Sequence, residues 1–370
     1  MSEKKKRVSA FCNDALGILD GVGIADPSRP GIVLGRHELV AGHHDRDLRL
    51  RVDEHGRTSQ RRHHSDLTGT NLRSGANHER SLRDVRRLQD LQAEIEGRHA
   101  RGLLDEEFYQ ERLTFFTFSP PDDFPSAASL LAVAVPRPQT RIVFTWNEET
   151  RALILPPTYQ GYLQVAQRTG ELLTRWMAPE GYRVAPARLP NKALAVCSGL
   201  AEYGRNNITY IPGMGSFFQL VVFYSDLPCP EDPWREPRMM DRCGGCRACL
   251  VKCPTGAIAA ERFLFHAERC IVFHNERGLE HPFPSWIDPA SHNCLMGCMI
   301  CQQYCPEDKD FLQWIEGDVA FSHEETSLLL TGPSPDQLPA AARAKLEYLE
   351  LLDSLEILPR NLGVFFKSVG

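Results

Sequence analysis

The chain has 370 residues, of which 42% are hydrophobic and 24% are charged. These proportions are typical of a soluble globular protein, and the length allows two domains with a substantial core. The formal net charge of −6 argues against bulk non-specific binding to nucleic acid.

No run of apolar residues approaches the length of a membrane span, so we expect no membrane partner. The basic stretch at residues 1–7 is followed neither by the apolar region of a secretory signal nor by a twin-arginine signal. We therefore expect a cytoplasmic protein whose cysteines remain reduced.

Residues 1–41 are expected to form an N-terminal helical segment, with a helix over residues 8–24. Residues 42–77 are rich in histidine and arginine and poor in large apolar side chains, which predicts a polar and mobile insertion. An RNA-contacting arm and a metal-binding histidine tract are the alternatives for this insertion.

Residues 78–236 are expected to form an α+β domain. Its predicted helices cover residues 78–113, 162–177 and 192–203, and the last should end at Gly204 as the glycine that follows a helix. Its predicted strands cover residues 129–135, 141–146, 152–155, 207–211 and 217–224. An iron–sulfur module over residues 237–312 and a helical tail over residues 313–370, with a helix at 337–358, complete the chain.

Nine of the twelve cysteines lie between Cys243 and Cys305. The first run has the spacing C-x2-C-x2-C-x3-C-P of two-cluster bacterial ferredoxins, in which the fourth cysteine binds the other cluster. We therefore assign one [4Fe-4S] cluster, cluster one, to Cys243, Cys246, Cys249 and Cys305. The second, cluster two, is assigned to Cys253, Cys270, Cys298 and Cys301.

The remote ligand of cluster two has a rival in Cys294. A symmetric ferredoxin would place a cysteine three residues before Cys298, whereas Cys294 stands four residues before it. Cys270 fills this position better, and Cys294 remains the alternative. Paired zinc knuckles would also use C-x2-C pairs, but nine cysteines and two Cys-Pro steps favour iron–sulfur clusters. The pattern therefore predicts transfer of single electrons.

The segment at residues 197–227 is dense in glycine and polar side chains between apolar elements. Glycine lets the backbone approach a ligand closely, and Arg205 and Asn206 are suited to binding phosphate or amide groups. Ordinary turns are the alternative interpretation of this composition.

Several motifs in the second half of the chain resemble those of epoxyqueuosine reductases and reductive dehalogenases. They are S-G-L-A-E-Y-G-R-N-N at residues 198–207, M-G-S-F at 214–217, S-D-L at 225–227, C-P-T-G-A-I at 253–258, R-C-I at 269–271 and G-C-x2-C-Q-x2-C-P at 297–306. Both families are cobalamin-dependent enzymes with two [4Fe-4S] clusters. The resemblance covers roughly residues 125–312.

The resemblance implies a fold in which a nitroreductase-like α+β cobalamin domain precedes the ferredoxin-like module. It implies that residues 199–207 and 213–217 line the corrin, with the binding residues Gly199, Gly204, Arg205, Asn206, Gly215 and Ser216. It also supports Cys270 as the remote ligand. Electrons from a low-potential donor, ferredoxin or flavodoxin, would enter at cluster one and pass through cluster two to cobalamin, which carries the difficult chemistry.

The chain departs from the family pattern at two places. Epoxyqueuosine reductases carry a catalytic aspartate at the position that Ala185 occupies here, and their helical-repeat region for tRNA is shortened to one helical tail. Both departures disfavour tRNA and favour a small-molecule substrate. Replacement proton donors are Tyr203 and Glu202, with Arg188 and Lys192 in the same region, although each also fits a purely structural role.

Three functions remain open from the sequence. The first is a corrinoid-dependent reductase of a small molecule. The second is a ferredoxin-like electron carrier or activator without corrinoid. The third is an epoxyqueuosine reductase that acts in tRNA queuosine synthesis with a relocated proton donor.

Overall fold

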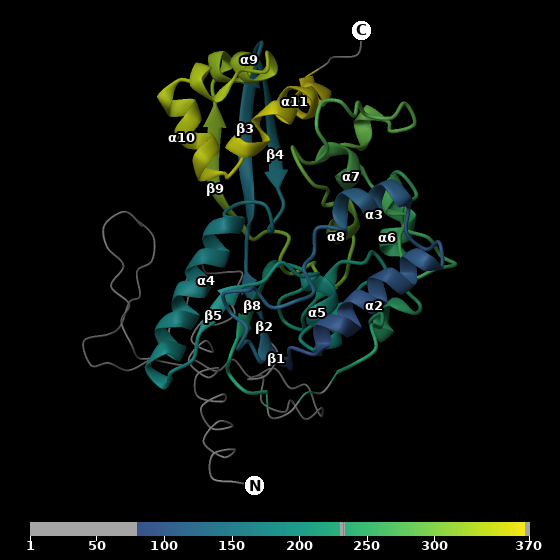
Figure 1. Ribbon diagram of the computed structural model, residues 1–370. Helices are drawn as coiled ribbons and strands as arrows, with labels where there is room; N and C mark the ends of the chain where they lie inside the picture. The colour runs from purple at the N-terminus through teal and green to yellow at the C-terminus, as the bar shows by residue number, and fades with distance from the viewer. Residues whose placement is uncertain (1–79, 230–231, 233, 367–370) are drawn as a thin grey trace, which may run out of the picture.

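The computed structural model describes residues 80–366 apart from residues 230, 231 and 233 (Figure 1). The expected helix at residues 8–24 and the expected insertion at 42–77 lie outside the described residues. The described part is a mixed α and β structure with three sheets. Within it, no helix is both long enough and apolar enough to cross a membrane.

A four-stranded antiparallel sheet forms the centre of the first half of the described chain. Its strand order is β1 (Arg80–Asp84), β2 (Ser129–Pro136), β8 (Phe218–Ser225) and β5 (Val184–Pro186). Strand β8 is buried along its whole length, as its nearly continuous apolar sequence requires when both faces of a sheet are covered. The expected helix over residues 78–113 is wrong at its start, because residues 80–84 pair with β2 as a strand.

Helices cover both faces of this sheet because side chains alternate along its strands. Helix α4 (Tyr162–Met177) packs on the face that carries Val133, Val221 and Phe223. Helices α2 (Arg87–Ala100) and α5 (Asn191–Cys197) pack on the opposite face, which carries residues such as Ala132 and Val222. The short helix α3 (Glu106–Arg112) follows α2.

A second sheet joins the middle of the chain to its tail. The strand order is β4 (Glu149–Leu155), β3 (Gln139–Trp146) and β9 (Ile315–Phe321), with β3 and β4 antiparallel and β3 and β9 parallel. Helices α9 (His323–Leu330), α10 (Ala340–Tyr348) and α11 (Leu358–Phe366) share one apolar core with this sheet, at the top of Figure 1. The tail is therefore not helical throughout. The sequence did not predict strand β9, because only Val319 and Phe321 on it are buried and the apolar alternation of a strand is therefore short.

Helix α5 ends earlier than expected. Gly199 adopts a left-handed backbone with φ 78°, and the amides of Gly199 and Leu200 donate to the carbonyls of Val196 and Ala195, each at 2.9 Å. This Schellman turn closes the helix after Cys197. Residues 202–203 then form β6 and pair with β7 (Thr209–Tyr210), so Gly204 is not the glycine that ends the helix.

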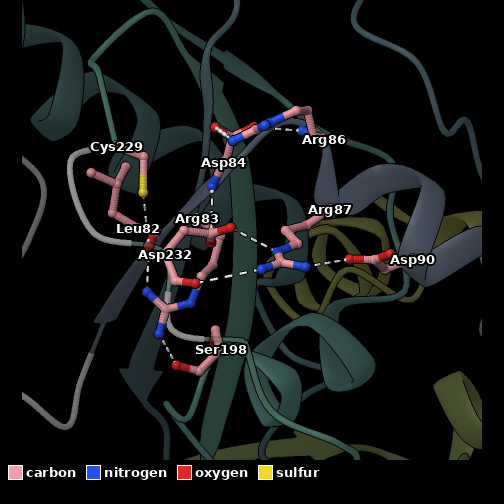
Figure 2. Close-up of polar contacts among 9 residues, drawn as sticks. All are labelled: Leu82, Arg83, Asp84, Arg86, Arg87, Asp90, Ser198, Cys229 and Asp232. Carbon is pink, nitrogen blue, oxygen red and sulfur yellow. Dashed lines mark hydrogen bonds and ion pairs between the residues drawn. The ribbon is translucent and has the colours of Figure 1, made fainter.

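Hydrogen bonds from charged side chains connect this turn to β1. Figure 2 shows the guanidinium of Arg83 on β1 reaching the carbonyl of Ser198, while Arg87 donates to Asp232 and Asp90, each at 2.7 Å. Beside them, the guanidinium carbon of Arg235 lies only 2.8 Å from the place of a Cβ on Gly199. The turn at Gly199 is therefore covered by protein, which leaves no room there for a side chain.

Replacing Phe321 with alanine should test whether the tail belongs to the folded core. Its ring is 1% exposed and stacks on Phe144 with centroids 4.9 Å apart. We expect Phe321→Ala to lower the free energy of unfolding by about 3–5 kcal/mol, measured by urea unfolding. Tyr348→Ala is the control, because Tyr348 is 54% exposed on the same tail, and it should cost below about 1 kcal/mol. Equal effects would contradict a packed tail.

Candidate functional site

Two short helices bring the cysteine runs together. Helix α6 (Ala248–Lys252) contains Cys249, helix α8 (Ile300–Gln303) contains Cys301, and the two helices lie against each other. Pro254 and Pro306 each follow a cysteine directly after these helices. Proline cannot continue a helix, so the chain turns away and the neighbouring cysteines are left facing the space between the runs.

The four cysteines assigned to cluster one surround a small cavity. Cys305, from the second run, lies there beside Cys243, Cys246 and Cys249 from the first run. Burial raises the pKa of Cys249 to about 11. A buried thiol in this state ionises when a metal centre compensates the charge, which is the condition that an iron–sulfur cluster creates.

Three residues expected to bind a corrin border this cavity instead. They are Gly204, Arg205 and Asn206. The guanidinium of Arg205 donates to the carbonyls of Cys243 at 2.7 Å and Cys246 at 3.2 Å, and so fastens the loop of the first run. A Cβ on Gly204 would lie 2.5 Å from both Asn206 Oδ1 and the ring of Tyr210, so glycine is required at this position.

Asn206 and Tyr210 connect the surroundings of the two cysteine groups. The Asn206 amide donates to the Tyr210 hydroxyl at 2.9 Å. Hydrogen bonding from Asn206 opposes the effect of burial on the pKa of Cys301, and Tyr210 does the same for Cys305. Polar groups that favour a thiolate also influence the reduction potential of a cluster bound to it. Tyr210 was missed in the sequence because a lone tyrosine in a strand has no distinctive pattern.

The second set of cysteines lies deeper in the molecule. The thiols of Cys253 and Cys298 lie close enough to Cys270 to raise its pKa, and those of Cys270 and Cys298 likewise raise the pKa of Cys301. Burial raises the pKa of Cys270 to about 12, and it also raises that of Cys301 well above its ordinary value. In the described part of the chain, no group of three or more His, Cys, Asp or Glu side chains is arranged to hold a single metal ion.

Cys294 occupies a different environment from these four. It is 1% exposed and packs against Phe217 and Met299. Its thiol donates to Asn293 Oδ1 at 3.2 Å, and the Asn293 amide in turn donates to the Cys298 sulfur at 3.1 Å. Cys294 therefore supports the cysteine loop by packing and through Asn293.

Gly215 and Ser216 also contact the cysteine module. The backbone amide of Ser216 donates to Asp308 Oδ1 at 2.7 Å, and its hydroxyl donates to Asp308 Oδ2 at 2.8 Å. The hydroxyl also lies 2.8 Å from Gln302 Oε1, between Cys301 and Cys305. These contacts attach the glycine turn before β8 to the second cysteine run. Asp308 is buried, and burial raises its pKa to about 6.

A cavity of about 820 Å³ lies between the four-stranded sheet, helices α2, α3 and α5, and the iron–sulfur module. Its wall is mostly apolar and aromatic, with lining residues that include Phe108, Phe115, Phe116, Leu189, Phe223, Phe263 and Phe265. Ala267, three residues before Cys270, is part of the wall. A cavity of this size and character is typical of a ligand or cofactor site.

Polar groups enter the cavity at a few points. Asn191 lines it, and its buried Oδ1 accepts no hydrogen bond from the described residues while its amide donates to the Leu220 carbonyl at 3.0 Å. Lys192 also lines it. Burial lowers the pKa of Lys192, and Cys270, Glu276 and Cys301 oppose this effect. Sequence reasoning missed Asn191 because its unpaired oxygen is apparent only from the packing.

The structure separates the two proposed proton donors. Tyr203 lines the cavity, and burial raises the pKa of its hydroxyl, so the phenol stays protonated. Glu202 does not line the cavity and instead pairs with Arg238 at 3.4 Å. Arg188 lines the cavity, and Ala185 lies on β5 next to Pro186, which is also part of the wall. Of the residues expected at the corrin, only Tyr203 and Asn207 from the segment 199–207 line this cavity.

Comparison with known families identifies the cysteine module. The family described as a 4Fe-4S double cluster binding domain matches residues 242–308. The chain therefore carries a double 4Fe-4S domain, which confirms the class of cofactor that the cysteine spacing predicted.

Two curated relatives are similar to part of the chain. An epoxyqueuosine reductase from Yersinia pestis is 35% identical over 123 residues, which cover 33% of this chain and 28% of that protein. An epoxyqueuosine reductase from Pseudomonas aeruginosa is 31% identical over 159 residues, which cover 42% of this chain and 43% of that protein. The chain spans less than half the length of these relatives. The matches confirm the resemblance to epoxyqueuosine reductases seen in the motifs.

Solved structures show the same relationship at the level of fold. The epoxyqueuosine reductase from Streptococcus thermophilus has a TM-score of 0.54 and 18% identity, over 77% of this chain and 76% of that chain. An epoxyqueuosine reductase crystallised with a tRNA-Tyr epoxyqueuosine-modified tRNA stem loop has a TM-score of 0.53 and 19% identity over the same shares. A catabolic reductive dehalogenase reaches a TM-score of 0.33, a likeness too weak to support an argument about this chain.

The contact between the glycine turn and the cysteine module can be tested by Gly215→Ala. Gly215 has φ 57°, and an added Cβ would lie 2.4 Å from Asp308 Oδ1. We expect a loss of about 2–5 kcal/mol in the free energy of unfolding, from the left-handed backbone and from displaced Asp308. Gly181→Ala is the control, because Gly181 is also left-handed, with φ 83°, but nothing lies within 4 Å of the added Cβ. It should lower the free energy of unfolding by about 1–2 kcal/mol. If both variants unfold at the same urea concentration, the contact between the glycine turn and Asp308 contributes nothing to the stability of the fold.

Proposed function

We propose that this chain, which carries a double 4Fe-4S domain and shares the fold of epoxyqueuosine reductases, is an iron–sulfur reductase. Electrons would pass through two clusters to a ligand held in the large cavity. The observation that carries this proposal is the position of the cavity, whose wall includes Lys192, close to the cysteines of the second set, and Ala267 just before Cys270.

We assign the cluster ligands as the cysteines are grouped in space. Cys243, Cys246, Cys249 and Cys305 would hold cluster one, and Cys253, Cys270, Cys298 and Cys301 would hold cluster two. Cluster two would then lie beside the cavity, and cluster one beside the exposed loop at Gly244 and Gly245. This arrangement supports an electron path from the surface through cluster one and cluster two to the cavity.

A corrinoid is the proposed ligand of the cavity. The four-stranded sheet with helices on both faces supports a nitroreductase-like cobalamin domain. The apolar wall suits the face of a macrocycle, and the unpaired Asn191 Oδ1 suits an amide donor of its side chains. When bound, the corrinoid would supply a low-potential metal centre for the reductive step. The expected binding residues Gly199, Arg205, Gly215 and Ser216 do not line this cavity and are better explained by their contacts within the protein.

Lys192 and Tyr203 are the candidate proton donors in this arrangement. Both line the cavity, and Ala185, which stands at the position of the family aspartate, supplies no carboxyl. Burial lowers the pKa of Lys192, which makes its ammonium a stronger proton donor, and burial keeps the Tyr203 phenol protonated. Glu202 lacks access to the cavity.

Epoxyqueuosine-modified tRNA is the first substrate to test. The sequence disfavoured tRNA, but the curated relatives are named epoxyqueuosine reductases, and a solved enzyme of the same fold is bound to a tRNA stem loop. These findings make tRNA a plausible partner. A small organic molecule is the second candidate, which Ala185 favours because the family aspartate is missing. A ferredoxin-like carrier without corrinoid is the third, and the large cavity argues against it.

Serine substitutions should distinguish the two rival ligands of cluster two. We expect the wild-type protein, purified without oxygen, to contain about eight irons per chain, and Cys270→Ser to lose about four of them. Cys294→Ser should keep about eight, because Cys294 packs against Phe217 and Met299. Iron content and electron paramagnetic resonance of the reduced protein provide the measurement. The reverse result would assign Cys294 as the ligand.

Corrinoid binding and turnover test the function itself. Protein from cobalamin-fed cells should contain one corrinoid per chain and convert an epoxyqueuosine-containing tRNA stem loop to queuosine under a low-potential reductant. Corrinoid without turnover would exclude this substrate and direct the search to small molecules. A protein with full iron content that never binds corrinoid would refute the reductase proposal and leave the electron carrier.

A further inference from the structure

The surface over the first cysteine run combines exposed apolar side chains with positive charge. Val251 on helix α6 is 69% exposed, and Tyr304, the residue that follows the neighbouring helix α8, is 50% exposed. The ammonium of Lys252 lies 4.6 Å from the centre of the Tyr304 ring. Arg247 is also exposed. We call these four residues, Arg247, Val251, Lys252 and Tyr304, the α6–α8 face.

Each residue of this face lies within two residues of a cysteine in the sequence. Arg247 follows Cys246, Tyr304 precedes Cys305, and Val251 and Lys252 lie between Cys249 and Cys253. A protein bound to this face would therefore be within a few residues of the cluster-one ligands. Large exposed apolar side chains surrounded by charge are a common feature of protein-binding surfaces.

The charge of the face contrasts with that of the whole chain. Residues 242–252 contain Arg242, Arg247 and Lys252 and no acidic residue, in a chain of net charge −6. Arg242 pairs with Glu307 at 2.8 Å, and Asp241 is exposed just before it. Arg247 and Lys252 thus leave the face locally positive beside its apolar pair. This arrangement complements an acidic partner and would speed its encounter with this side of the molecule.

We propose that the α6–α8 face is the docking surface for a small acidic electron-carrier protein that reduces cluster one. This inference rests on the proposed cluster assignment and names the partner for the same site. Each encounter would oxidise the carrier by one electron and reduce one [4Fe-4S] cluster by one electron. The surface is small, as is typical of transient redox complexes, in which charge at the rim controls the rate of association.

The test mixes oxidised, iron-loaded protein with reduced flavodoxin in a stopped-flow instrument without oxygen. Bleaching of the clusters and formation of the flavodoxin semiquinone are both followed, and neither readout needs substrate or corrinoid. We expect the double variant Arg247→Glu/Lys252→Glu to lower the second-order rate constant about tenfold at low salt, and the difference to shrink at high salt. Reduction by dithionite should be unchanged.

Two further variants complete the test. Tyr304→Ala should slow the reaction with flavodoxin at every salt concentration, because it removes apolar contact without changing charge. Arg175→Glu is the matched charge control, since Arg175 is exposed on α4, away from α6 and α8 in Figure 1, and it should react at the wild-type rate.

Several results would overturn the proposal. The first is a double variant that is reduced by flavodoxin at the wild-type rate. The second is a double variant and a Tyr304→Ala variant that are slowed as much with dithionite as with flavodoxin. The third is an Arg175→Glu variant that is slowed as much as the double variant. A fourth would be weaker binding of a tRNA stem loop by the double variant with unchanged reduction by flavodoxin, which would assign the face to nucleic acid. A failed turnover assay would leave the test intact, because it reads only cluster reduction.

Discussion

Holding two distant cysteine runs side by side is the constraint on which the rest of this structure depends. Burial raises the pKa of Cys249, Cys270 and Cys301, so these thiols need a compensating positive centre to favour their ionised form. The protein must therefore position the cysteines through other contacts. Arg205 fastens the first run by its carbonyls, and Ser216 anchors the second through Asp308. Glycines are needed beside both contacts, because a Cβ on Gly215 would collide with Asp308 and one on Gly204 would collide with Asn206 and Tyr210.

The tail extends this support to the loops of the second set of cysteines. Arg360 and Asn361 on α11 donate hydrogen bonds to the backbone carbonyls of Asn275, Arg277, Gly278, His281 and Leu295. The Asn275 side chain in turn bonds both the carbonyl and the amide of Gly297, the residue before Cys298. Helix α11 also packs on the sheet that contains β9. The position of the loop before Cys298 therefore depends on the folded tail. The tail therefore supports the iron–sulfur module directly.

The sequence predicted local features well and long-range contacts poorly. The periodic helix at residues 162–177 and the apolar strands β2 and β8 were expected within one or two residues of their ends, because burial repeats along each of them. Strand β1 has charged residues and was taken for helix, since its pairing with β2 is not encoded locally. The sequence singled out the motif at residues 198–207 as a corrin-binding segment, but the structure places Gly204, Arg205 and Asn206 beside the cysteines and not on the wall of the large cavity. Spacing along the chain identifies such residues, whereas only packing decides what they contact.

Under the proposed cluster assignment, the difference between the two cysteine sets would give electron flow a direction. The first run lies under an exposed loop, where Gly244, Gly245 and Arg247 are all exposed. In the second set, burial raises the pKa of Cys270, Cys298 and Cys301, and Cys270 and Cys301 influence the pKa of Lys192 on the cavity wall. Asn206 and Tyr210, hydrogen-bonded to each other, connect the surroundings of Cys301 and Cys305. A cluster near water and one in an apolar interior differ in how strongly their surroundings stabilise added negative charge. In the proposed path, electrons enter at the surface, so the cavity can exclude water that would compete with a bound substrate for electrons.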